Sequence, residues 1–172
     1  GIVLLKNEGL LPLKKDTKIA LLGIGAEKTI KGGTGSGDVN NRESVSIYAG
    51  MKEKNAGIVS EEWLKDYHNR YEQARAEWKE QILEAAIHVD NPFDAYAANP
   101  FAMPDGRAVT NEDIKAAEAA VYVISRISGE GKDRRKRKGD YYLSDQEEKD
   151  LYFLNEQKIP TVLIINAGGP VE

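Results

Sequence analysis

Residues 121–147 read V-Y-V-I-S-R-I-S-G-E-G-K-D-R-R-K-R-K-G-D-Y-Y-L-S-D-Q-E, and this stretch decides the fold. It begins with the apolar run Val121–Ile124, which predicts a buried strand. Near its end stands Ser144, which has Glu147 three residues later. This is the spacing of a helix N-cap with a capping box. The residues between the two elements therefore form a strand-to-helix loop.

Within this loop a single carboxylate, Glu130, stands between Gly129 and Gly131. Glycine on both sides lets the backbone adopt conformations that hold a side chain over an open site. A Gly-Glu-Gly sequence is also an ordinary turn, so the spacing alone leaves a catalytic and a purely structural interpretation open.

Strands and helices alternate along the rest of the chain. Two further short apolar runs, Lys18–Gly23 and Thr161–Ile165, predict buried strands. Helices are expected at Ser44 to about Asn55, Asn111–Ala120 and Ser144 to about Gln157. This alternation predicts a parallel sheet with right-handed crossovers. The expected fold is a three-layer α/β/α sandwich with a mainly parallel sheet, a helical insertion in the middle and a truncated C-terminal end.

The middle of the chain carries a different pattern. From Ser60 to about His88, aromatic and apolar residues recur every three or four positions, which predicts one long amphipathic helix. Its aromatic stripe could stack on sugars, but a single stripe at helical spacing favours core packing. Residues 90–110 are rich in proline and form an irregular excursion, either a lid or an insertion. We assign residues 58–112 as an insertion within one partial domain of residues 1–172.

Three glycine-rich loops follow the three predicted strands. They are Lys31–Asp38, Gly129–Asp140 and Asn166–Pro170. Ligands of parallel sheets bind beyond the carboxyl ends of the strands. The sequence therefore predicts that the three loops meet at one mouth.

Nucleotide binding fits these loops poorly. A P-loop needs Gly-Lys-Ser/Thr at its end, whereas Gly37 is followed by Asp38, whose charge repels phosphate. The sequence Gly23-Ile-Gly25 follows a strand, but Lys28 stands where a dinucleotide fingerprint has its third glycine. Nucleotide binding stays as a third alternative.

Composition and charge argue against several other classes of function. The chain has 172 residues, a net charge of −4, no cysteine and two histidines, so we expect no metal site and no cofactor. The basic run Lys132–Lys138 lacks interleaved aromatic residues, which argues against nucleic acid. No apolar run reaches the roughly 20 residues that span a bilayer. Both ends look cut from a longer chain, so the lack of a visible signal peptide says little, and localisation stays open with the cytoplasm slightly favoured.

Five stretches in the same order resemble the second domain of glycoside hydrolase family 3 enzymes, the β-glucosidase group. They are residues 2–13, 19–38, 45–52, 125–145 and 162–172. Residues 60–110 match nothing in that pattern.

The resemblance implies a TIM-like barrel that supplies an aspartate nucleophile and an (α/β)6 sandwich that supplies a glutamate acid/base. Retaining hydrolysis needs these two carboxyl groups about 5 Å apart. The family's glutamate loop matches the one that holds Glu130, which is therefore the candidate acid/base, with Asp133 and Asp140 as fallback carboxylates. By the same resemblance, substrate-binding residues are expected at Gly33, Thr34, Gly35, Ser36 and Arg134.

The implied barrel is not part of these residues. We therefore expect the chain alone to be inactive, and the partners to be that barrel and a β-linked glycoside or oligosaccharide. A truncated sheet would expose an edge or an apolar patch, which predicts self-association. The alternative function is a non-catalytic α/β binding or scaffold module.

Overall fold

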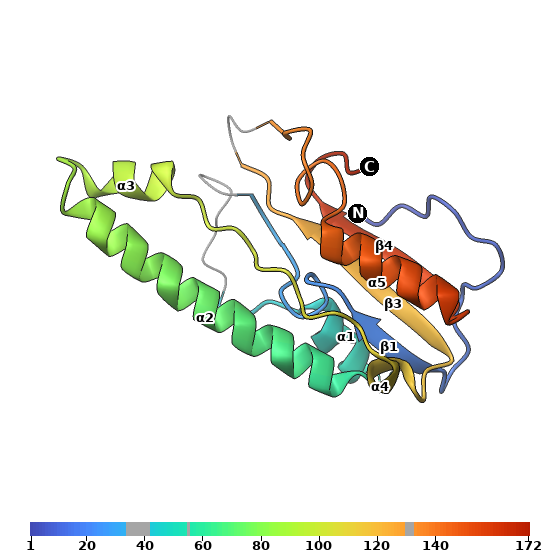
Figure 1. Cartoon of the computed structure of the whole chain (residues 1–172). Coiled ribbons are helices and arrows are strands. Elements are labelled where there is room, and N and C mark those ends of the chain that lie inside the picture. Colours follow the sequence, from blue (N-terminus) through green and yellow to red (C-terminus); the bar gives the residue numbers. More distant parts are fainter. Residues whose placement is uncertain (34–41, 55, 130–132) are drawn as a thin grey trace.

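Strands and helices alternate along the described chain except between β2 and β3, where three helices follow one another (Figure 1). The structure, a computed structural model, describes residues 1–33, 42–54, 56–129 and 133–172. Its elements are β1 (Lys18–Leu22), α1 (Ile47–Glu53), β2 (Gly57–Ile58), α2 (Glu61–Ala86), α3 (Pro92–Ala98), α4 (Asn111–Ile114), β3 (Ala119–Arg126), α5 (Asp145–Glu156) and β4 (Thr161–Ala167). Among the helices of these ranges, none has the length and apolar character needed to cross a membrane.

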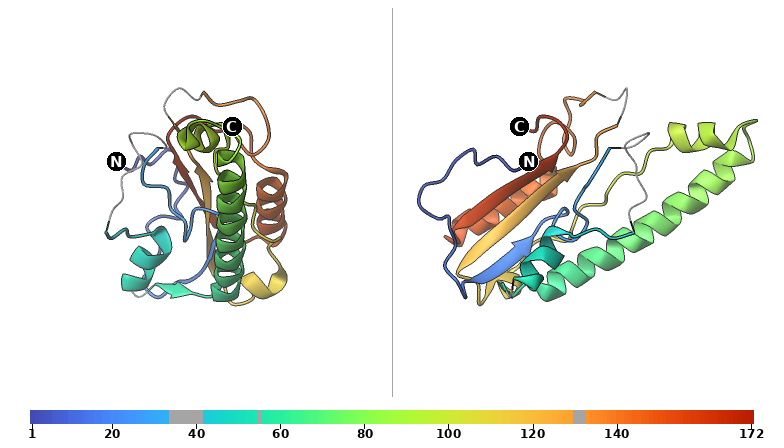
Figure 2. Two further views of the ribbon diagram at one scale, coloured as in Figure 1. Left: turned by 90° about the vertical axis from the view of Figure 1, so that its left-hand side faces the viewer. Right: turned by 180° about the vertical axis from the view of Figure 1, so that it is seen from behind.

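The described strands form one parallel sheet in the order β2-β1-β3-β4. Helices α1 and α5 lie on opposite faces of it (Figure 2). The predicted α/β fold with a mainly parallel sheet is therefore confirmed. The longest pairing joins β3 to β4, from Ala120 opposite Thr161 to Arg126 opposite Ala167.

Strand β3 runs through the centre of the core. All eight of its residues are buried, as expected for a parallel strand with neighbours on both sides and layers on both faces. Leu21 and Leu22 of β1 and Leu154 of α5 belong to the same apolar cluster. The phenol of Tyr122 donates to the Asp150 carboxylate at 3.0 Å, so this buried hydroxyl is satisfied.

Helix α2 begins in this core and then extends away from the sheet (Figure 1). Its first two turns bury Trp63, Leu64 and Tyr67. Farther along, the Trp78 ring meets the edges of Tyr96 and Phe101, with ring centroids 5.7 Å apart in each pair. The aromatic stripe therefore packs against the protein itself, as the helical spacing indicated.

Several boundaries differ from the sequence-based expectation. Ser46, not Ser44, caps α1, because its hydroxyl accepts the N–H of Ala49 at 3.0 Å. Helix α4 ends at Ile114, since the chain enters β3 five residues later. The two-residue β2 and the short α3, which Asn91 caps within the proline-rich excursion, are too brief to produce a periodic signal.

Strand β4 pairs with β3 alone among the described strands and forms one edge of the sheet. Leu163 and Ile165, which alternate along it, are 46% and 44% exposed. The apolar residues Ile2–Leu5 at the N-terminus are also exposed. An exposed edge of this kind fits the self-association that the sequence predicts, which stays a prediction.

Candidate functional site

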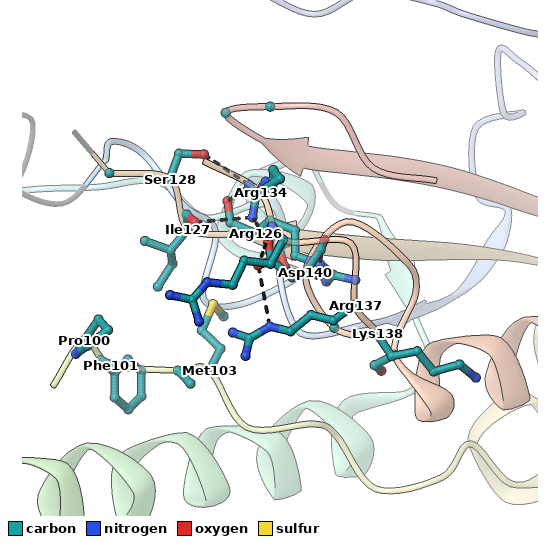
Figure 3. Close-up of a pocket in the computed structure, with 18 of the residues that line it drawn as sticks. Pro100, Phe101, Met103, Arg126, Ile127, Ser128, Arg134, Arg137, Lys138 and Asp140 are labelled. Carbon is teal, nitrogen blue, oxygen red and sulfur yellow. Dashed lines mark hydrogen bonds and ion pairs between the residues drawn. The ribbon is translucent and has the colours of Figure 1, made fainter. Parts of the chain in front are cut away.

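A groove lies at the carboxyl end of the sheet, where β1 and β3 are neighbours (Figure 3). The chain leaves β1 toward α1 on one face and leaves β3 toward α5 on the other (Figure 2). Such a switch in direction opens a crevice beyond the strand ends. The groove has a volume of about 1110 Å³ and is lined by residues Arg126–Gly129, Arg137–Asp140, Gly168–Pro170 and Pro100–Met103, among others.

Ser128 is the point at which the three glycine-rich loops meet. A Cβ atom placed on Gly33 would lie 2.9 Å from the Ser128 carbonyl oxygen. A Cβ atom on Gly168 would lie 2.6 Å from the Ser128 hydroxyl oxygen. Glycine is therefore required at both contacts, because any larger residue would force the loops apart. The prediction that the three loops share one mouth is confirmed for their described residues.

The glycines at the end of β1 have a packing role. Gly23 has a φ of +88°, and a Cβ atom there would lie 2.6 Å from the Val123 amide nitrogen of β3. A Cβ atom on Gly25 would lie 2.7 Å from a Val123 methyl group and would overlap the Ser125 hydroxyl. The close approach of β1 to β3 accounts for Gly23-Ile-Gly25 without a dinucleotide.

Asn166 holds the start of the glycine-rich loop that follows β1. Its Oδ1 accepts the Ile30 N–H at 2.7 Å and the Ser125 hydroxyl at 2.9 Å, and its Nδ2 donates to the Ile30 carbonyl at 3.0 Å. The side-chain amide thus binds the Ile30 backbone in the way that a neighbouring strand would. Sequence analysis assigned Asn166 only to a turn, because its partner Ile30 lies 136 residues away.

A buried ion pair fixes the return of the β3 loop into α5. The Arg126 guanidinium binds the Glu147 carboxylate at 2.8 and 2.5 Å, and the two side chains are 4% and 3% exposed. Arg126 also donates to the Asp140 carbonyl at 2.9 Å. Glu147 in turn accepts the Ser144 N–H at 2.8 Å, which confirms the predicted capping box. One carboxylate therefore joins the end of β3 to the start of α5.

Two of the candidate residues pair with each other beside the groove (Figure 3). Arg134 binds the Asp140 carboxylate at 3.1 Å. Burial raises the pKa of Asp140, but bonds from the Arg135 N–H and the Arg134 guanidinium outweigh it, so the pKa lies below its ordinary value. A carboxylate held ionised in this way is a poor proton donor. Asp133, the other fallback carboxylate, is exposed at the rim of the groove.

The remaining predicted site residues fall outside the described part of the chain. They are Glu130, Thr34, Gly35 and Ser36. The residues that border them are placed: Gly33 and Gly129 both contribute to the junction at Ser128. The structure thus locates the bases of both loops at one edge of the sheet.

Three residues of the basic run, Arg134, Arg137 and Lys138, pair with carboxylates. Lys138 binds Asp145 at 2.5 Å and Glu148 at 2.9 Å, and Arg137 lies 3.7 Å from Asp140. Among the described residues of the run, these pairs offset part of the positive charge. Across residues 1–33, 42–54, 56–129 and 133–172 there is no cluster of three potential metal ligands.

A parallel sheet with a loop-lined groove at its switch point defines a class of α/β domain that presents its site along one edge. Residues 2–172 match the profile of the glycosyl hydrolase family 3 C-terminal domain. The chain therefore belongs to that family.

Similar proteins are β-glucosidases that are much longer than this chain. The chain is 28% identical to β-glucosidase A of Butyrivibrio fibrisolvens and 27% identical to a β-glucosidase of Ruminococcus albus. Both matches cover 100% of this chain but only 22% and 17% of those proteins.

Solved structures agree with these matches. β-Glucosidase 3B of Thermotoga neapolitana, in complex with α-D-glucose, superimposes with a TM-score of 0.73 at 37% identity, over 99% of this chain and 23% of that one. A β-glucosidase of Paenibacillus barengoltzii gives a TM-score of 0.71 at 29% identity, over 99% of this chain and 17% of that one.

Proposed function

We propose that this chain acts as the C-terminal domain of a retaining β-glucosidase-type enzyme and contributes the acid/base and part of the sugar-pocket rim. The observation that carries the proposal is the meeting of three loops at Ser128, in a chain that belongs to glycosyl hydrolase family 3. The loop with Glu130 and the loop with Thr34, Gly35 and Ser36 share this junction. Their residues can therefore face one substrate.

Glu130 is the proposed proton donor. In the first step its carboxyl proton passes to the glycosidic oxygen as the bond to the anomeric carbon breaks, while an aspartate of the barrel attacks that carbon. In the second step the Glu130 carboxylate takes a proton from the water that releases the sugar. The loop from Gly33 to Ser36 borders the leaving group.

Asp133 stays the fallback acid/base, because it is exposed at the groove and lies three residues after Glu130. Asp140 is a weaker candidate. Its lowered pKa and its ion pair with Arg134 suit a fixed acceptor better than a group that must gain and lose a proton in each cycle.

The decisive test uses the full-length enzyme, in which a barrel accompanies this chain. Glu130→Ala should slow the hydrolysis of an aryl β-glucoside at least 100-fold. Azide should restore the rate and yield a glycosyl azide, because azide attacks the glycosyl-enzyme without help from a general base. Asp133→Ala tests the fallback carboxylate and should retain near-normal rates if Glu130 is the acid/base.

Near-normal activity of Glu130→Ala would show that another residue is the acid/base. The domain would then be a structural wall of the pocket. The isolated chain should not turn over aryl β-glucosides, since the covalent step needs the nucleophile. Robust turnover by the isolated chain would contradict the proposal that the barrel supplies the nucleophile and this domain supplies the acid/base. If the domain is instead a non-catalytic module, both the full-length protein and the isolated chain should bind glycosides, and neither should hydrolyse them.

A further inference from the structure

Arg134 lies at the neck of the loop that carries Glu130, where the chain leaving β3 and the chain returning to α5 come together (Figure 3). Its Nη2 donates to the Ser128 hydroxyl at 3.1 Å, on the outgoing side. Its Nη1 donates to the Asp140 carboxylate at 3.1 Å, on the returning side. One guanidinium thus joins the two sides of the loop, two residues before Glu130 and ten after it.

Weaker contacts continue this pattern on the outgoing side. The guanidinium lies 3.5 Å from the Ile127 carbonyl oxygen and 3.4 Å from the Arg126 carbonyl oxygen. The turn after β4 covers it as well, because a Cβ atom on Gly169 would lie 3.5 Å from the Arg134 Nε. The guanidinium is thus engaged by the protein on several sides, which favours a role in holding the loop over direct binding of sugar hydroxyls.

The pair is sheltered enough to act as a fixed brace. The Arg134 and Asp140 side chains are 14% and 17% exposed, so water screens their attraction only in part. Asp140 also accepts the Arg135 N–H at 3.1 Å, which fixes the backbone directly after Arg134. The charge-assisted bond from Arg134 and the backbone bond from Arg135 share one carboxylate, so each helps to hold the acceptor of the other in place.

We propose that Arg134 is a positioning residue, which sets the place of the acid/base through the neck of its loop and does not itself touch substrate. The inference rests on the proposed function of Glu130. A proton donor must come within about 2.6–3.2 Å of the glycosidic oxygen. A displacement of about 1 Å can reduce the rate on the order of 100-fold. Loss of the brace therefore weakens proton transfer more than it weakens binding.

Substrates with different leaving groups separate a loss of proton transfer from a loss of substrate binding in the full-length enzyme. Dinitrophenolate departs without protonation, whereas an alkoxide does not, so only the second substrate depends on a well-placed acid. Arg134→Gln should lower kcat/KM for an alkyl β-glucoside about 30-fold or more and for dinitrophenyl β-glucoside less than about 3-fold. Lys136→Gln, an exposed neighbour on the same loop, should change neither rate. Equal losses on both substrates, or a raised KM with an unchanged kcat, would overturn the proposal in favour of direct substrate binding.

A second measurement tests the brace without any catalysis. In the full-length enzyme, Arg134→Gln should speed hydrogen exchange of the Arg135 amide at least 10-fold, while the amide of Ser144, which Glu147 holds, stays protected. Unchanged exchange at Arg135 would overturn the brace. If exchange responds as expected but Glu130→Ala shows no azide rescue, the brace stands and the proposed function of Glu130 fails.

Discussion

The groove edge of the sheet and the arm formed by α2 and α3 are held by different forces. At the groove edge, polar side chains with several partners fix the loops: Asn166 binds Ile30, and Arg126 binds Glu147. In the arm, aromatic rings pack against one another, as the Trp78 ring does edge-to-face with Tyr96 and Phe101. Hydrogen bonds specify direction and distance, whereas aromatic contacts tolerate small shifts. The chain thus uses directional bonds at the groove edge and burial of apolar area in the arm.

The base of the arm belongs to the core, and its outer part does not. Trp63 is 1% exposed and its indole donates to the Arg107 carbonyl, whereas Trp78, only half-buried, donates to the Asn99 carbonyl. The two tryptophans make the same kind of bond from the same helix. They therefore form a natural pair for separating the role of core burial from that of local support.

The largest effect is expected at the base of the arm. Trp63→Ala should reduce the free energy of unfolding by about 4–5 kcal/mol, because it leaves a large cavity in the core and an unpaired Arg107 carbonyl. Urea titration followed by far-UV circular dichroism measures the loss. A loss below about 2 kcal/mol would show that the arm is not anchored in the core.

The second-largest loss of stability is expected at the buried ion pair of the groove edge. Arg126→Met should cost about 3–4 kcal/mol, since it leaves the Glu147 carboxylate buried without its partner. The double variant Arg126→Met/Glu147→Met should recover much of that loss, because no charge is then left buried. The same urea titration compares the two. A double variant as unstable as the single one would mean that the bonds of Arg126 to backbone carbonyls matter more than its ion pair.

A smaller effect is expected in the outer arm. Trp78→Ala should lower the free energy of unfolding by about 1–2 kcal/mol, because the ring is half-buried and its neighbours can close over the gap. Hydrogen exchange should quicken in α3 and leave β3 unchanged. A loss equal to that of Trp63→Ala would erase the distinction between the base and the outer part of the arm.

The smallest expected effect concerns pH. Burial raises the pKa of Asp150, although bonds from the Val109 N–H, Gln146 and Tyr122 oppose the rise. A raised pKa means that the folded state keeps its proton longer than the unfolded state, so this contribution to stability falls as pH rises from about 4 toward 7. Asp150→Asn should therefore lose less stability, relative to the native chain, at pH 7 than at pH 4.

The urea midpoints at the two pH values measure that difference. Asp140→Asn is the matched control, because the lowered pKa of Asp140 gives the opposite sign: its contribution is present above about pH 4 and is lost as pH falls. If the stability losses of both variants changed in the same direction with pH, local burial and pairing would not control the pKa values of these two carboxyl groups.

Local patterns in the sequence were enough to predict the main elements. Ser144 and Glu147 marked the start of α5, and the runs at Lys18–Gly23 and Val121–Ile124 marked β1 and the middle of β3. The helical spacing from Ser60 to about His88 predicted α2, which ends two residues earlier, at Ala86. The predicted cap at Ser44 was wrong, because either serine could cap a helix and only the contact with Ala49 selects Ser46.

The sequence also predicted that three loops would meet, since strand direction alone places them at one edge of the sheet. It did not reveal what holds them there. The bond from Asn166 to Ile30 spans 136 residues, and the Arg126 pair with Glu147 spans 21, so neither produces a local pattern. The main helices and strands and the common direction of the strands could therefore be predicted from short-range periodicity, capping and the alternation of strands with helices. The placement of the site loops was decided only by the tertiary structure, because it depends on hydrogen bonds between residues that folding alone brings together.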